Sequence, residues 1–185
     1  MLKLYGAARS RASIVQWYLE ELGIPYEFVK LDMQAGEHRQ PAYLAINPMG
    51  KVPAIVDGDL QLWESGAILL YLDEKYGKFQ HSPEERAKIT QWVFFANSTL
   101  ATGIFVETNR EREMPRLMTP LNEILQRQLF LVGGKFTVAD IAVGSVLSFI
   151  PIMLKIDLSS YPAVFTYMKR LSERPAFQAT IGSRR

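Results

Sequence analysis

The sequence predicts a mixed α/β domain followed by an all-helical domain, because the hydrophobic period changes once along the chain. Up to about Tyr76, alternating runs typical of strands are interspersed with helical patterns. A polar connector follows at 77–83, and beyond it the 3.6-residue helical period continues to the end. We therefore expect an α/β domain at 1–76, a linker at 77–83 and an all-helical domain at 84–185.

The first domain is expected to contain a parallel βαβ unit and a hairpin. Leu2–Tyr5 and Tyr26–Leu31 alternate as strands do, and the helical pattern between them stops at Gly23. Ala54–Val56 and Leu60–Trp63 predict two further strands around an Asp-Gly-Asp turn. With a helix after the hairpin, this order fits a thioredoxin-like domain, whose ligands collect at the loop after the first strand.

In the second domain, helix starts are marked by proline and by capping patterns. Ser82-Pro83-Glu84-Glu85 has a capping hydroxyl, a proline and acidic residues, and its helix is expected to run towards Phe105. Thr137–Asp140 has the capping-box pattern ahead of an apolar run that reaches Ile150. Further helices are expected at about 114–131, from Pro162 and from Pro175.

Composition excludes several functions. The chain has 185 residues, is 48% hydrophobic and can bury one sizeable core or two small ones. Its net charge is +2 and its basic residues are scattered, which argues against nucleic acid as a partner. It contains no cysteine, so disulfides, thiolate metal sites and dithiol redox motifs are excluded and no metal is expected. Any thiol chemistry would use a thiol on the substrate.

The chain is expected to be cytoplasmic and without a membrane segment. It begins directly with a strand pattern, which leaves no room for a signal peptide. Its most apolar stretch, Ile141–Leu154, is too short to span a bilayer and contains Pro151.

The stretch Asn47–Ser65 has features of a peptide-binding site. Pro53 has no N–H and pushes Val52 to extended geometry, so Val52 can offer its backbone groups to an extended peptide. Glu64-Ser65-Gly66 opens a helix, whose first N–H groups are unpaired and attract an anion. Together these features predict pairing with a peptide backbone beside a seat for a carboxylate or phosphate.

The segment NPMGKVPAIVDGDLQLWESGAILLYL is similar to the glutathione-binding segment of the cytosolic glutathione transferases. Phe-Thr-x-Ala-Asp at 136–140 also resembles a motif of that family's second domain. The resemblance covers nearly the whole chain and implies the glutathione transferase fold, with a cis peptide bond at Pro53. The short chain and its Ala-Ala-Arg-Ser loop resemble bacterial members, among them the chi class of cyanobacteria.

The resemblance assigns glutathione contacts to particular residues. Ser65 would hold the γ-glutamyl carboxylate and Glu64 the ammonium group, and Val52 with Pro53 would clasp the backbone. His38 and Lys51 match positions that reach the glycine carboxylate in theta-like members. On local pattern alone, Glu64 and Ser65 could instead simply cap the helix, and His38 and Lys51 could be solvated surface residues.

The residue that activates the thiol is predicted less directly. A thiol of pKa about 8.5 attacks poorly at neutral pH, and lowering that pKa by about 2 units requires roughly 2.7 kcal/mol. One hydroxyl hydrogen bond to a charged acceptor contributes about 1.5–3 kcal/mol, which Ser10 at the first helix start can supply. The family's catalytic serine or cysteine position falls on Arg9. We therefore predict Ser10 first and Arg9 second; the alternatives are an ordinary N-cap and a solvent-facing arginine.

The electrophile is expected between the first loop and the first long helix of the second domain. Four helix residues recur at spacings of three and four, and two small loop residues would form the floor. These residues are Phe94, Asn97, Ala101 and Phe105 on the helix and Ala7 and Ala8 in the loop. The small side chains suggest compact electrophiles, whereas the alternative is that the helix residues belong to the domain core.

The expected function is a glutathione transferase that conjugates the glutathione thiolate to small electrophiles, as in detoxification. Glutathione is then a co-substrate and no other cofactor is implied, and by resemblance the protein is a homodimer. One alternative is a non-catalytic interaction module on the same fold. Another is a glutathione-dependent peroxidase or dehydroascorbate reductase, although the lack of cysteine disfavours a mixed disulfide on the protein.

Overall fold

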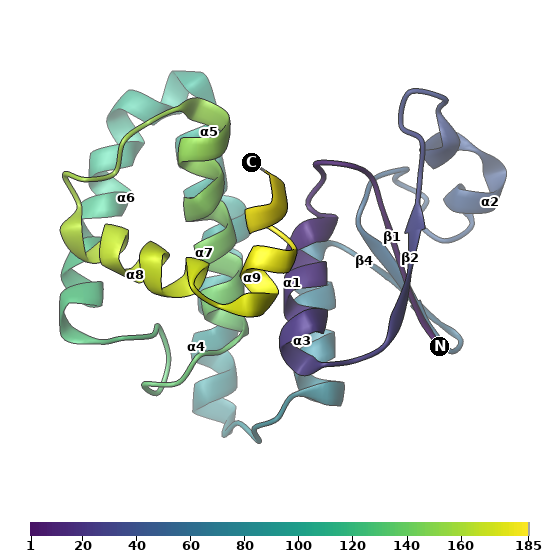
Figure 1. Cartoon of the computed structure of the whole chain (residues 1–185), viewed down its shortest axis with the longest axis horizontal. Coiled ribbons are helices and arrows are strands. Elements are labelled where there is room, and N and C mark those ends of the chain that lie inside the picture. The colour runs from purple at the N-terminus through teal and green to yellow at the C-terminus, as the bar shows by residue number, and fades with distance from the viewer. Residues whose placement is uncertain (185) are drawn as a thin grey trace. The chain divides into compact units, whose positions relative to one another are not determined.

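The computed structural model describes residues 1–184, which form two compact units. Unit 1 comprises Met1–Gln80 together with Ala179–Arg184, and unit 2 comprises His81–Gln178. Figure 1 shows the elements of both units, which are described separately below.

Unit 1 is built on a four-stranded mixed sheet in the order β2-β1-β3-β4. β1 runs parallel to β2, with Leu4 beside Phe28, and antiparallel to β3, with Leu4 beside Ile55. β3 and β4 form the predicted hairpin. The strands are β1 (Leu2–Gly6), β2 (Tyr26–Lys30), β3 (Ala54–Asp57) and β4 (Leu60–Trp63).

Two amphipathic helices cover one face of this sheet. α1 (Ala12–Leu22) and α3 (Ser65–Tyr76) pack side by side, and α2 (Pro41–Leu44) lies beyond the opposite face (Figure 1). Short 3₁₀ turns lie at η1 (Glu37–Arg39) and η4 (Gly182–Arg184). The large side chains of unit 1 with almost no exposed surface are Leu4, Ile14, Trp17, Leu19, Ile55, Ile68, Leu69 and Leu72.

Unit 2 is helical and is organised around α7 (Val138–Phe149), in which every residue from Val138 to Ser148 is buried. A helix that is buried on all sides needs neighbours around it, and for α7 these are α4, α8, η2 and η3. The other elements are α4 (Pro83–Phe94), η2 (Phe95–Leu100), α5 (Ala101–Phe105), α6 (Glu107–Arg127), η3 (Ile150–Leu154), α8 (Pro162–Ser172) and α9 (Pro175–Ala179).

Both predicted helix caps of unit 2 are present. Ser82 and Glu85 form a reciprocal capping box at the start of α4, and Thr137 and Asp140 form one at the start of α7. Asp140 is fully buried, and its carboxylate also accepts hydrogen bonds from the Leu131 N–H (3.0 Å) and the Tyr167 hydroxyl (2.8 Å). This buried carboxylate therefore connects α7 to α8 and to the loop that precedes α7.

One sequence expectation about unit 2 was wrong in its bounds, and another had the right extent but missed a change of helix geometry. The helix expected from Met114 begins at Glu107 and ends at Arg127. Its first turns are polar and exposed, so no apolar period marks them. The helix expected to run towards Phe105 does reach it, but it changes to π geometry over Phe95–Leu100, which a regular 3.6-residue pattern does not reveal.

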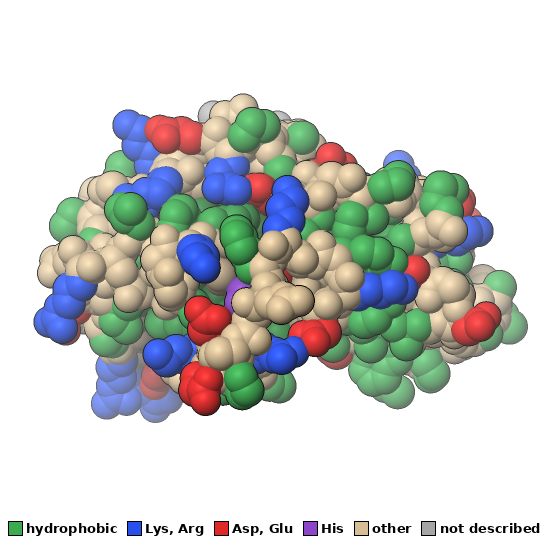
Figure 2. All heavy atoms as spheres, turned by 90° about the horizontal axis from the view of Figure 1, so that it is seen from below, with side chains coloured by type: hydrophobic (Ala, Val, Ile, Leu, Met, Phe, Trp, Pro, Cys, Tyr) green, Lys and Arg blue, Asp and Glu red, His purple; other side chains and the backbone are tan. Residues whose placement is uncertain are grey.

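Among residues 1–184, no helix combines the length and the hydropathy needed to cross a bilayer. Figure 2 shows basic and acidic side chains interspersed over the visible face of the molecule. This mixture agrees with the scattered charge pattern of the sequence.

Candidate functional site

A cavity of about 270 Å³ lies within unit 1, at the junction of α1, the loop before β3 and the start of α3. It brings together five of the residues predicted to bind glutathione. Its lining residues are Arg11, Asn47, Met49, Lys51, Val52, Pro53, Glu64 and Ser65.

The loop before β3 is held in shape by local hydrogen bonds. Asn47 Oδ1 accepts from the Met49 N–H at 3.0 Å, and the Gly50 N–H donates to the Asn47 carbonyl at 2.9 Å. Gly50 has φ +61°, and a Cβ there would lie 3.0 Å from the His38 carbonyl oxygen, so glycine is required at this turn. The Val52–Pro53 peptide bond that follows is cis.

Glu64 and Ser65 form the opposite wall at the start of α3. Glu64 has φ +70° and ψ 117°, a backbone conformation that costs a non-glycine residue about 1–3 kcal/mol. Its side chain makes no capping hydrogen bond with the helix, which disfavours the simple capping role. Ser65 is buried, and it begins a helix whose first N–H groups face no intrahelical acceptor. This wall can bind a carboxylate and present a carboxylate of its own.

The charged groups of the cavity are complementary to glutathione. Arg11 and Lys51 are cationic and Glu64 is anionic, whereas glutathione carries two carboxylates and one ammonium group. Burial lowers the pKa of Arg11 and the charge of Glu64 opposes that shift, so the two side chains interact electrostatically. The cavity thus presents both cationic and anionic side chains to a ligand of mixed charge.

Three predicted residues lie outside the lining of this cavity, which is assigned from residues 1–184. Ser10 Oγ accepts from the Ala7 N–H at 3.1 Å and donates to the Ala7 carbonyl at 2.8 Å, so it stabilises the turn before α1. Arg9 is exposed and has φ +56°. His38 lies in η1 next to the Gly50 turn, and its buried Nδ1 has no hydrogen-bond partner among the described residues.

The residues predicted for the electrophile are divided between the two units. In unit 1, Ala7 is buried and Ala8 is exposed. In unit 2, Phe94 is 66% exposed at the end of α4, while Asn97, Ala101 and Phe105 are half-buried. Because π geometry separates Phe94 from Ala101, their predicted alignment on one regular helix face does not follow from the sequence spacing. The electrophile site stays a prediction.

Unit 2 has an aromatic-rich cavity of its own, of about 540 Å³, between α4 with η2 and α6. Its lining has no charged side chain: Gln91, Trp92, Phe94, Phe95, Ser98, Thr99, Leu117, Pro120, Leu121 and Ile124. Of the predicted electrophile residues it includes Phe94.

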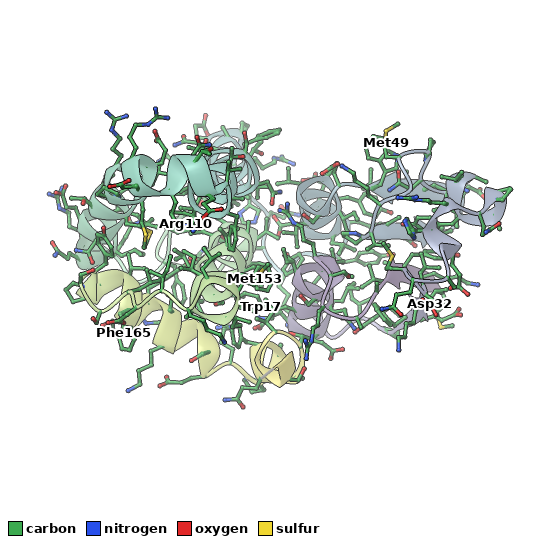
Figure 3. All side chains as sticks on the ribbon, turned by 90° about the horizontal axis from the view of Figure 1, so that it is seen from above. Trp17, Asp32, Met49, Arg110, Met153 and Phe165 are labelled. Carbon is green, nitrogen blue, oxygen red and sulfur yellow. The ribbon has the colours of Figure 1, made fainter. Side chains whose placement is uncertain are left out.

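Sequence reasoning missed three residues of the unit 1 cavity. Arg11 follows the predicted catalytic position Ser10. Because it lies far from the Asn47–Ser65 segment in sequence, no local pattern indicated that it lines the same cavity. Asn47 and Met49 lie inside that segment, and Asn before a proline-containing turn is a signal for side-chain bonding to the loop backbone. Met49 is 59% exposed and points away from the ribbon into solvent (Figure 3).

The donor set of unit 1 suits an organic anion rather than a metal ion. Among residues 1–184, no group of three or more His, Asp or Glu side chains is arranged to hold a metal. The cavity instead combines cations, the start of a helix and free backbone groups.

Comparisons with known proteins agree with this geometry. Residues 1–74 match the glutathione S-transferase N-terminal domain and residues 84–184 match the C-terminal domain. The chain is 34% identical to the disulfide-bond oxidoreductase YfcG of Escherichia coli, over 95% of this chain and 92% of that protein. It is 31% identical to glutathione S-transferase D7 of Drosophila melanogaster, over 91% of this chain and 83% of that protein.

Solved structures give the same result. The glutathione transferase URE2P6 of Phanerochaete chrysosporium, in complex with oxidized glutathione, has a TM-score of 0.85 and 33% identity. The alignment covers 99% of this chain and 96% of that chain. From the two domain matches, these relatives and the shared fold, we conclude that the chain belongs to the glutathione S-transferase family.

Proposed function

We propose that this protein binds glutathione in the unit 1 cavity and conjugates its thiolate to small electrophiles. The observation that carries the proposal is the charge and backbone pattern of the cavity. Ser65 and the start of α3 receive one carboxylate, Glu64 receives the ammonium group and Lys51 attracts the second carboxylate. Val52 offers its backbone to the central cysteinyl residue.

In the proposed reaction the thiol first loses its proton to solvent. The thiolate sulfur then forms a bond to an electrophilic carbon. In substitution, a leaving group such as halide departs with its electron pair; in addition, the π electron pair moves to the neighbouring atom, which then takes a proton from solvent. The protein would contribute by stabilising the thiolate and by holding the two reactants together. No redox or metal cofactor is needed for this step.

Three residues are proposed for stabilising the thiolate: Ser10, Arg9 and Arg11. To donate to sulfur, Ser10 would have to turn its hydroxyl away from the Ala7 carbonyl. Arg11 joins the two predicted residues because it lines the cavity and carries a positive charge there. Alanine substitution at each position, followed by spectroscopic titration of bound glutathione, identifies the group: its loss raises the pKa of the bound thiol.

The proposed assembly is a two-fold homodimer. The expectation of a dimer comes mainly from the family. The 50% exposure of the apolar Phe79 side chain adds weak support, because a dimer interface could cover it. Light scattering across a dilution series measures the mass. The cytoplasmic location also stays a prediction.

The decisive experiment combines binding and turnover. Glutathione affinity is measured by titration calorimetry, and conjugation is measured with a panel of isothiocyanates, halonitrobenzenes and bulkier polycyclic electrophiles. We expect binding, with faster turnover of the compact substrates. Binding without turnover of any electrophile would refute conjugation, and if disulfides are not reduced either, it would favour the interaction-module alternative. Absence of binding would refute the whole proposal.

A second candidate is the reduction of disulfides by glutathione. It is favoured by the similarity to the disulfide-bond oxidoreductase YfcG, which covers 95% of this chain. The chain has no cysteine, so two glutathione molecules would supply both electrons. One glutathione thiolate attacks the substrate disulfide, forms a mixed disulfide and releases the first substrate thiolate. A second glutathione thiolate attacks the glutathione sulfur of the mixed disulfide, forms oxidised glutathione and releases the second substrate thiolate.

The two candidate reactions leave different products. Conjugation yields a thioether and consumes one glutathione per electrophile, whereas disulfide reduction yields oxidised glutathione from two. Chromatography of the products with hydroxyethyl disulfide and with a halonitrobenzene separates these outcomes in a single experiment.

A further inference from the structure

The Lys51 carbonyl oxygen, which belongs to no β-strand, accepts hydrogen bonds from two side chains. The Tyr43 hydroxyl donates to it at 2.6 Å and Asn47 Nδ2 donates at 2.7 Å. Both donors are well shielded, since Tyr43 is 3% and Asn47 is 2% exposed. The Lys51 side chain itself is exposed, so these bonds act on the backbone of Lys51 and not on its ammonium group.

This carbonyl belongs to the same peptide group as the Val52 N–H. A trans peptide unit is planar, with its C=O and N–H pointing in opposite directions. Fixing the carbonyl on one side therefore fixes the N–H on the other. Val52 lines the cavity, and within residues 1–184 its N–H donates no backbone hydrogen bond.

We propose that Tyr43 and Asn47 are positioning residues that aim the Val52 N–H at the backbone of bound glutathione. The inference rests on the proposed function and adds the residues that orient its central contact. A loop amide that is free to rotate must be ordered when the ligand binds, and this ordering weakens affinity. Two buried donors remove that freedom before binding.

The two donors are themselves held in place. The Tyr43 ring packs against Tyr5, with ring centroids 5.8 Å apart. Burial raises the pKa of Tyr43 to about 12 and a hydrogen bond with Asn47 opposes that rise, so the hydroxyl keeps its proton at neutral pH. The Met49 N–H donates to Asn47 Oδ1 at 3.0 Å, which orients the amide so that Nδ2 faces the Lys51 carbonyl. Neither donor needs to rearrange.

The test uses Tyr43→Phe, because Tyr43 does not line the cavity and phenylalanine keeps the buried ring. Without the hydroxyl's hydrogen bond to the Lys51 carbonyl, the Val52 amide has to be ordered when glutathione binds, and the Kd for glutathione should rise about fivefold. The turnover rate at saturating glutathione should stay within about twofold of the wild type, because the reacting atoms are untouched. In ¹⁵N-labelled protein, the Val52 amide signal should shift without ligand and respond less to glutathione.

The matched control is Tyr18→Phe. Tyr18 is also buried in unit 1, and its hydroxyl donates to Asp73, which lies about 12 Å along α3 from Ser65. This variant should leave the Kd and the Val52 signal unchanged. Should Tyr43→Phe fail to fold, Asn47→Ala removes the other donor. Because Asn47 also lines the cavity, only the Val52 amide signal of the ligand-free protein is compared for this variant, and an unmoved signal would overturn the positioning role.

The possible outcomes are distinguishable. An unchanged Kd together with an unchanged Val52 signal in Tyr43→Phe would overturn the positioning role. Equal weakening in Tyr18→Phe would also overturn it, because general loosening of unit 1 would then explain the loss. If wild-type protein does not bind glutathione, the proposed function fails and this inference fails with it, and the wild-type titration alone reveals that case.

Discussion

The side chain of Asp57 should stabilise unit 1 through its negative charge. Asp57 lies at the β3 end of the hairpin and is 11% exposed. Its Oδ2 accepts hydrogen bonds from the Tyr71 hydroxyl (2.7 Å), the Tyr76 hydroxyl (2.7 Å) and Lys75 Nζ (2.8 Å), all of α3. The Asp57 carboxylate therefore connects the β3–β4 hairpin to the last turns of α3. The first residue of α3, Ser65, lines the cavity.

Asp57→Asn removes the charge and keeps a side chain suited to the turn before Gly58. A hydrogen bond to a charged group contributes about 1.5–3 kcal/mol and a neutral one about 1 kcal/mol. Each tyrosine bond should therefore weaken by about 1 kcal/mol, so the free energy of unfolding should fall by about 2 kcal/mol at pH 7. Urea titration followed by circular dichroism measures this difference.

The same difference should depend on pH. Partial burial alone raises the pKa of Asp57, but the hydrogen bonds from Lys75, Tyr76 and Tyr71 together hold it below its ordinary value of 3.8. A lowered pKa means that the unfolded chain binds the proton more readily. The stabilisation is therefore fully present above about pH 4 and is lost as the pH falls through the folded-state pKa. Asp57→Asn should lack this acid-dependent loss.

The control is Asp59→Asn, which removes the same charge from the exposed side of the same turn. It should change the free energy of unfolding by no more than about 0.5 kcal/mol. The reasoning is refuted if Asp57→Asn costs no more than this control, or if the gap between wild type and Asp57→Asn is as large at pH 2.5 as at pH 7.

Three further predictions concern the cavity and unit 2. Ser65→Ala should raise the Kd for glutathione at least about tenfold, since it loses a hydroxyl on a carboxylate; an unchanged Kd in calorimetry contradicts that contact. Gly50→Ala should lower the free energy of unfolding by about 1–2 kcal/mol because of its φ of +61° and the nearby His38 carbonyl; equal urea midpoints contradict this. Tyr167→Phe leaves Asp140 without one of its donors and should cost about 1–2 kcal/mol, whereas Ser160→Ala, which removes the hydroxyl of an exposed serine, should cost little in the same urea assay.

Much of the fold was readable from local patterns. Alternating and helical periods placed the four strands and the main helices, and proline and capping residues such as Ser82 and Thr137 marked helix starts. These signals are local because they reflect which face of an element is buried and how its end is satisfied. The polar start of α6 and the π geometry of η2 were missed for the same reason, since neither alters the local apolar pattern.

The candidate site could be predicted from the sequence where its residues lie in one continuous segment, Asn47–Ser65. Lys51, Val52, Pro53, Glu64 and Ser65 were all predicted, and all five line the cavity. The roles proposed for them rest on residue type and on their place before a strand or at a helix start. The role of Ser10 was less readable, because its hydroxyl bonds to Ala7 only once the turn has closed.

By itself, the sequence determined the order of elements, the family resemblance and the segment that lines most of the unit 1 cavity, because each depends on residues close together in the chain. Only the tertiary structure decided which distant groups join that segment. Arg11 reaches the cavity from α1, and Tyr43 holds the Lys51 carbonyl from α2. Such contacts depend on how helices pack on the sheet, and no local period or spacing encodes that packing.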